Sequence, residues 1–174
     1  MSIKIERIYG ENIMVYAGIK HDYSNRIFWF KVPKSLSDRI AVQGKVICET
    51  KYGFQPGDVV ELISCKERSE IKRSTGITPS KSVVGVNTSI DIDKVIIPSA
   101  FSNTVPSPEK IANREAEYKL FGKFLTKIEF SRGGYLIDGY TAYLAAKKLG
   151  VKELDGFMML YTRKKGNNEQ EKEG

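Results

Sequence analysis

The chain has 174 residues, 41% hydrophobic and 28% charged, which is the balance of a globular protein rather than of a disordered chain. Its longest apolar runs, such as residues 27–30, have four residues, whereas a membrane-spanning helix needs roughly 20, so no membrane association is expected. The net charge of +7 is compatible with binding to nucleic-acid phosphates but is also common in proteins that bind none.

The first residues, MSIKIERIYGEN, alternate charged and apolar side chains and lack the apolar core of a signal peptide. We therefore expect a cytoplasmic protein, in which Cys48 and Cys65 are reduced and buried. His21 is the only histidine, so a zinc site is not expected. Because His21 precedes Asp22 in a predicted loop without a nucleophile motif, a solvent-exposed histidine is favoured over a catalytic pair.

Residues 1–65 form short β-type segments separated by turn residues, which predicts a small, barrel-like all-β module. The expected strands are 3–8, 13–16, 26–32, 45–50 and 59–64, with a turn of helix around 34–40. Alternation along 26–32 turns Phe28 and Phe30 to one face and Trp29 to the other. Trp29 is a candidate for stacking on single-stranded nucleic acid, and a half-buried packing residue is the alternative.

Residues 66–89 are polar, rich in Ser and Thr, and basic, which predicts a linker with one short strand at 82–86. The excess of positive charge is densest here, because residues 66–90 hold five basic and two acidic side chains. The candidate contacts to DNA phosphates are Lys66, Arg68, Lys72 and Arg73. A solvated linker whose charge only aids solubility is the alternative.

Residues 90–162 change to a mixed α/β pattern. Ser107, Pro108 and Glu109 predict a helix start, and Gly122 its end after Phe121. The expected strands are 90–97, 124–130, 135–137 and 157–161, with a second helix over 142–149. Residues 163–174 are predicted to be a disordered tail.

The turn between strand 135–137 and the second helix carries the most informative motif, GYLIDGYTAYLAAKKLGV. Asp138 or Thr141 is expected to cap the helix, and Gly139 allows the sharp turn. The amides of residues 139–142 lack partners within the helix and lie at its positive end, so this corner can receive a phosphate or a carboxylate. Every strand-to-helix turn shares part of this chemistry.

This stretch resembles the ParB/sulfiredoxin-like family, in which a strand, a tight turn and a helix ending in AAxxLG follow each other. The resemblance extends upstream to DIDKVIIP, SPEKI and FLTKIEF, and so covers residues 90–162. It implies an α+β protein, with a ParB/sulfiredoxin-like α/β domain after the β module. It also implies a nucleotide site, since partition proteins of this family bind CTP and sulfiredoxins bind ATP.

Carried over by position, the resemblance implies a phosphate-facing turn at Asp138, Gly139, Tyr140, Thr141 and Ala142. Partition proteins have Gly-Glu-Arg-Arg at this turn and sulfiredoxins have Gly-Cys-His-Arg. Ala142 therefore replaces the arginine that clamps phosphate, and Tyr140 replaces the catalytic cysteine, which excludes sulfiredoxin chemistry.

Lysines from the preceding segment, Lys123 and Lys127, are the candidate cations for a nucleotide at this turn. Lys147 and Lys148 lie at the far end of the helix, where they complement its dipole. A domain that kept the turn for folding and lost the ligand is the alternative.

The sequence thus favours a ParB-like accessory protein of a plasmid or mobile element, associated with nucleic acid or nucleotide and without evident catalysis. The expected ligands are DNA and a nucleotide with magnesium, and the oligomeric state is left open. An enzyme of phosphate chemistry (a nuclease, nucleotide hydrolase or kinase) and a purely structural adaptor are the alternatives.

Overall fold

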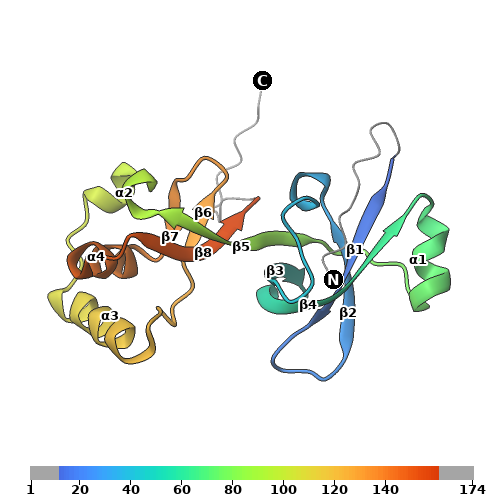
Figure 1. Cartoon of the computed structure of the whole chain (residues 1–174), viewed down its shortest axis with the longest axis horizontal. Helices are drawn as coiled ribbons and strands as arrows, with labels where there is room; N and C mark the ends of the chain where they lie inside the picture. Colours follow the sequence, from blue (N-terminus) through green and yellow to red (C-terminus); the bar gives the residue numbers. More distant parts are fainter. Residues whose placement is uncertain (1–11, 161–174) are drawn as a thin grey trace. The chain divides into compact units, whose positions relative to one another are not determined.

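The computed structural model describes residues 12–160, which divide between Val86 and Asn87 into an N-terminal unit and a C-terminal unit. Figure 1 shows strands in both units, and strand β5 (Val83–Asp91) crosses the boundary between them. The protein is therefore mixed α and β, as predicted. The first expected strand, 3–8, and the expected tail, 163–174, lie outside the described residues.

The N-terminal unit is an antiparallel sheet in the order β2-β1-β4-β3-β5. A parallel bridge between Lys31 and Ser82 also links β2 to the segment that enters β5. The barrel-like closure of this module stays a prediction. The other elements of the unit are β1 (Met14–Lys20), β2 (Ile27–Val32), the 3-10 turn η1 (Lys34–Leu36), β3 (Lys45–Thr50), β4 (Gly53–Cys65) and helix α1 (Arg68–Thr75).

Helix α1 occupies part of the linker expected over residues 66–89, and β5 begins within the same stretch, where a short strand was predicted over 82–86. Glu67 and Glu70 form a reciprocal capping box at the start of α1, and Gly76 ends it in the left-handed conformation. Ile71 is fully buried with Tyr16 and Cys65, in a cluster that Met14, Trp29 and Ile63 also contact. The segment is poor in apolar residues, yet α1 packs on the rest of the unit through the single buried side chain of Ile71.

The C-terminal unit continues from β5 in the order β5-β8-β6-β7, with β6 parallel to β8 and antiparallel to β7. Its core includes Phe130 and Leu154 from the strands, Ile128 from just before β6, and Ala142 and Ala146 from α4. Helices α3 and α4 lie side by side, joined by an ion pair of 2.6 Å between Lys148 and Glu115 (Figure 1). The remaining elements are η2 (Ile92–Lys94), α2 (Ser99–Ser102), α3 (Pro108–Phe121), β6 (Glu129–Ser131), β7 (Leu136–Asp138), α4 (Tyr140–Leu149) and β8 (Glu153–Met159).

The strand expected over residues 124–130 is shorter than predicted, since β6 begins only at Glu129. The Glu117 side chain accepts a hydrogen bond from the Leu125 amide and so holds the preceding residues as a loop against α3. Likewise, the strand expected over 90–97 ends at Asp91, where the Asp91 carboxylate caps the 3-10 turn η2 by accepting from the Asp93 amide. Among the helices of residues 12–160, none has the length and apolar character to cross a bilayer.

Candidate functional site

A groove of about 450 Å³ opens in the N-terminal unit, where the start of β1, the end of β2 and the start of α1 meet. The described residues that line it share a pattern: cationic and hydroxyl side chains stand beside apolar ones, and none of these residues is an aspartate or a glutamate. They are Ile13, Met14, Val15, Tyr16, Lys31, Val32, Pro33, Lys34, Ser37, Arg68 and Ser82.

The three cations of the groove have no ion-pair partner within residues 12–160. Lys31 is half-buried, whereas Lys34 and Arg68 are exposed. The two carboxylates nearest to Arg68 in sequence, Glu67 and Glu70, instead receive backbone amides in the capping box, at 2.7 Å for the Glu67 amide on Glu70. The groove therefore presents uncompensated positive charge, which attracts anionic ligands.

The charge of the chain is also uneven. Residues 12–86 carry 12 lysines and arginines against 7 aspartates and glutamates, whereas residues 87–160 carry 10 against 9. The N-terminal unit thus holds most of the positive excess, and the groove lies in that unit.

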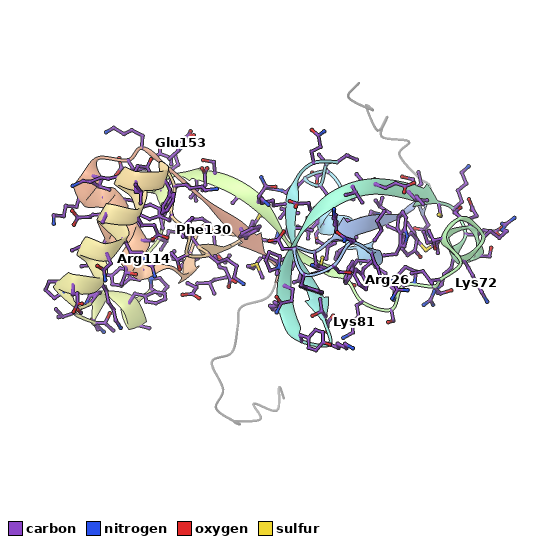
Figure 2. All side chains as sticks on the ribbon, turned by 90° about the horizontal axis from the view of Figure 1, so that it is seen from below. Arg26, Lys72, Lys81, Arg114, Phe130 and Glu153 are labelled. Carbon is purple, nitrogen blue, oxygen red and sulfur yellow. The ribbon has the colours of Figure 1, made fainter. Side chains whose placement is uncertain are left out.

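The predicted phosphate contacts of the 66–73 segment divide between two places. Arg68 lines the groove, and Lys66 precedes α1. Lys72 and Arg73 lie in the last turn of α1, both exposed, and Figure 2 shows Lys72 at the outer side of the helix. At this position their positive charges interact favourably with the negative end of the helix dipole.

Two cations of the groove, Lys31 and Lys34, were not predicted. Lys31 pairs with Tyr16 across β1 and β2, and Lys34 follows directly in η1. Strand alternation places Lys31 on the Trp29 face, which was the only sequence indication of a polar surface there. Their proximity to Arg68 depends on the packing of α1, which no local pattern specifies.

Trp29, the predicted stacking residue, is half-buried and packs against the cluster of Tyr16, Cys65 and Ile71 beneath α1. Its indole also lies over Gly18, its partner on β1, where an added Cβ would come within 3.2 Å of two ring atoms. Trp29 does not line the groove. Its stacking role stays a prediction.

His21 is buried rather than exposed, which contradicts the sequence-based expectation. Its ring stacks on Tyr23, with centroids 5.1 Å apart, and also contacts Phe28 and Phe30. His21 Nδ1 donates a hydrogen bond of 2.7 Å to the Pro56 carbonyl oxygen. The aromatic side chains around this loop bury His21, although the sequence of the loop is polar.

The corner at the start of α4 is closely packed. Gly139 is the N-cap with φ = 95°, and an added Cβ would lie 2.9 Å from Ile128 Cγ1. The expected side-chain cap is absent from this described helix; the Asp138 carboxylate instead accepts the Gly139 amide at 2.8 Å. Ile128, the residue just before β6, therefore lies directly beside the turn.

The remaining residues of the corner differ in accessibility. Tyr140 stacks on Phe101 with ring centroids 5.2 Å apart, and Ala142 is fully buried. Thr141 is half-buried. Within residues 12–160, no acceptor takes the amides of Tyr140, Thr141 or Ala142, as is usual for the first turn of a helix.

The two lysines predicted to serve this corner are not equivalent. Lys127 forms an ion pair of 3.1 Å with Glu129, whose side chain is completely buried. Lys123 is exposed in the loop after α3. At the other end of α4, Lys147 pairs with Asp93 at 2.8 Å, which raises the pKa of Lys147 and lowers that of Asp93. Lys147 and Lys148 thus lie in the last turn, as predicted.

The cysteines are free and buried, which confirms that part of the prediction. Burial raises the pKa of the Cys48 thiol to about 12. The pKa of the Cys65 thiol is also raised, mainly by burial and to a smaller extent by the negative charge of Glu70. Across residues 12–160, no group of three or more His, Cys, Asp or Glu side chains is arranged to hold a metal ion.

No family model and no curated protein matches the chain. Among solved structures, it is similar to two described as the N-domain of a pNOB8-like ParB, with 27% and 30% identity over 42% of this chain and TM-scores of 0.38 and 0.36. The matches span only 29% and 27% of those solved chains. The likeness to ParB-like domains is therefore a partial one.

Proposed function

We propose that this protein is a non-catalytic, ParB-like accessory protein that binds nucleic acid through the groove of its N-terminal unit. The observation that supports this most directly is the trio of Lys31, Lys34 and Arg68 around a groove whose lining includes no carboxylate from residues 12–160. Cations held without a protein counter-ion gain most from phosphates, whose condensed counter-ions are released on binding.

The exposed cations of α1 extend this interface. Lys72 and Arg73 share the helix that carries Arg68, so a phosphate backbone leaving the groove meets further positive charge. Phosphate contacts fix position without reading sequence, and the groove offers few groups for base-edge recognition. We therefore propose binding with little sequence preference. The resemblance to partition proteins supports the further proposal of a role in plasmids or mobile elements.

A salt-dependent binding series tests the proposal with a charge-matched control. The variant Lys31→Ala/Lys34→Ala/Arg68→Ala removes the groove cations, and Lys20→Ala/Arg26→Ala/Lys51→Ala removes three cations outside the groove. Figure 2 shows Arg26, which lies just before β2, whereas Lys31 lies near its other end. At about 50 mM salt, we expect at least a tenfold loss of affinity for the groove variant and less than threefold for the control.

Two results would contradict the proposal. Absence of binding to any single- or double-stranded nucleic acid at low salt would remove it, since phosphate contacts are strongest there. Equal losses in the two triple variants would show that net charge alone, and not the groove, drives binding.

Nucleotide binding at residues 138–142 stays a prediction from the family resemblance. A bound nucleotide would raise the melting temperature by mass action, so CTP and ATP with magnesium are the first probes. Thr141→Val is the informative variant, because it keeps the shape of a half-buried side chain and removes the hydroxyl. A shift that Thr141→Val and Lys123→Ala leave unchanged would place the nucleotide elsewhere.

A further inference from the structure

The groove of the N-terminal unit combines two chemistries. One set of side chains is cationic or hydroxylic, namely Lys31, Lys34, Arg68, Ser37 and Ser82. The other set is apolar and belongs to the start of β1 and the end of β2: Ile13, Met14, Val15, Val32 and Pro33. A site for phosphate alone needs only the first set.

The apolar set remains partly open to solvent. Ile13 is 37% exposed, and Met14, Val15 and Pro33 are half-buried. Helix α1 does not cover them completely; its Ile71 packs next to them, on Tyr16 and Cys65. Apolar surface beside uncompensated cations favours a ligand that carries both anionic groups and a weakly hydrated flat face.

We propose that the groove binds single-stranded nucleic acid in preference to duplex, with phosphates on the cations and an unstacked base against the apolar side chains. A duplex presents the same phosphates but keeps the faces of its bases stacked inside. The groove volume of about 450 Å³ suits roughly one nucleotide, on the scale of small-ligand pockets. This inference rests on the proposed function and adds the form of the ligand.

Three fluorescent 12-mers test the preference by anisotropy at equal salt: a single strand, the matching duplex, and a single strand of abasic sites. The abasic strand keeps the phosphates and removes the bases. We expect the single strand to bind about tenfold more tightly than the other two. Its salt dependence should have a slope of about −2 for three cations, and each lost cation should reduce the slope by about 0.7.

The variant Ile13→Ser removes apolar surface at an exposed position just before β1, and Ile27→Ser is the matched control, 49% exposed and outside the groove. We expect Ile13→Ser to weaken single-strand binding about fivefold and to leave duplex binding unchanged. Ile27→Ser should change neither. Circular dichroism melting verifies that both variants fold.

The outcomes separate this inference from the proposed function. If duplex or abasic strand binds as tightly as the single strand, or if Ile13→Ser weakens all ligands equally, the inference is wrong. The proposed function then survives provided that the triple groove variant still loses binding. If no nucleic acid binds, both fail together.

Discussion

The Tyr140 ring stacks on the Phe101 ring, with centroids 5.2 Å apart and planes 28° from parallel. Tyr143, one turn along α4, lies 6.2 Å from Tyr140 in a nearly parallel orientation. All three rings pack against the core of the C-terminal unit. Tyr140, at which the sequence resemblance places the catalytic cysteine of sulfiredoxins, thus packs against neighbouring rings, and the corner at the start of α4 has a structural role.

The first prediction concerns this aromatic pair. Tyr140→Ala should lower the free energy of unfolding by about 2 kcal/mol, since a half-buried aromatic side chain loses part of its burial. In a double-mutant cycle with Phe101→Ala, the coupling should be about 1 kcal/mol, as for other stacked rings. Urea unfolding measures both, and Tyr140→Phe serves as the control that keeps the ring. A coupling near zero would mean that the two rings are only neighbours.

The second prediction compares two glycines with positive φ. Gly139→Ala would bring a Cβ within 2.9 Å of Ile128 Cγ1 at φ = 95°, whereas an added Cβ at Gly122, with φ = 69°, meets nothing within 4 Å. Both variants bear backbone strain of about 1 kcal/mol. Gly139→Ala should therefore be at least about 1 kcal/mol more destabilising in urea unfolding. Equal losses of unfolding free energy in the two variants would show that Ile128 moves away from an added Cβ at little cost, so that the corner is loosely packed.

Local patterns in the sequence predict the two longer helices of the C-terminal unit, α3 and α4, but not the short helix α2. The Pro108 start and the Gly122 end of α3 are both found, because a fixed φ, a helix dipole and a left-handed stop act within one turn. Helix α4 begins two residues earlier than expected, at Tyr140, because Gly139 serves as the N-cap and the adjacent Asp138 accepts its amide. These features need no tertiary information.

The N-terminal unit shows why the rest could not be predicted. Helix α1 has one buried apolar side chain, Ile71, and therefore almost no periodic pattern. Lys31 and Arg68 are 37 positions apart in the sequence. Both line the groove because α1 packs near β1 and β2. His21 lies in a loop, as predicted, but it is buried because Phe30 on the next strand and the Pro56 carbonyl enclose it. Each of these depends on contacts between distant segments.

The third prediction concerns pH. Burial raises the pKa of Glu117, but hydrogen bonds from Arg114 and the Leu125 amide, together with the Arg114 charge, outweigh burial and lower the pKa below its usual range. A carboxylate with a lowered pKa stabilises the folded state above its unfolded pKa, and this stabilisation is lost as the pH falls through the folded value. Stability should therefore fall below about pH 5, with a smaller slope in Glu117→Gln.

Denaturant unfolding between about pH 6 and pH 3 measures this slope. Asp155→Asn is the matched control, because Asp155 is an exposed carboxylate of the same unit. An unchanged slope in Glu117→Gln would mean that the loop after α3 does not depend on the Glu117 charge.

The fourth prediction concerns the thiols. Since the thiolate is the reactive form and burial raises the Cys48 pKa to about 12, Cys48 should resist modification at pH 8. Cys65, 2% exposed, should behave in the same way. Neither thiol should react with Ellman's reagent in the folded protein, and both should react in denaturant. A Ser80→Cys variant supplies an exposed thiol for comparison; a native cysteine that reacts as fast would indicate local opening.

The last prediction separates the two roles of Trp29. The indole packs over Gly18 and against the cluster beneath α1, so Trp29→Phe should lower the free energy of unfolding by about 1–2 kcal/mol. Because Trp29 does not line the groove, single-strand affinity should stay within about twofold of wild type. Anisotropy and urea unfolding on the same variant decide between the roles. If affinity falls sharply while stability is kept, the indole stacks on nucleic acid, and α1 must move aside to expose it.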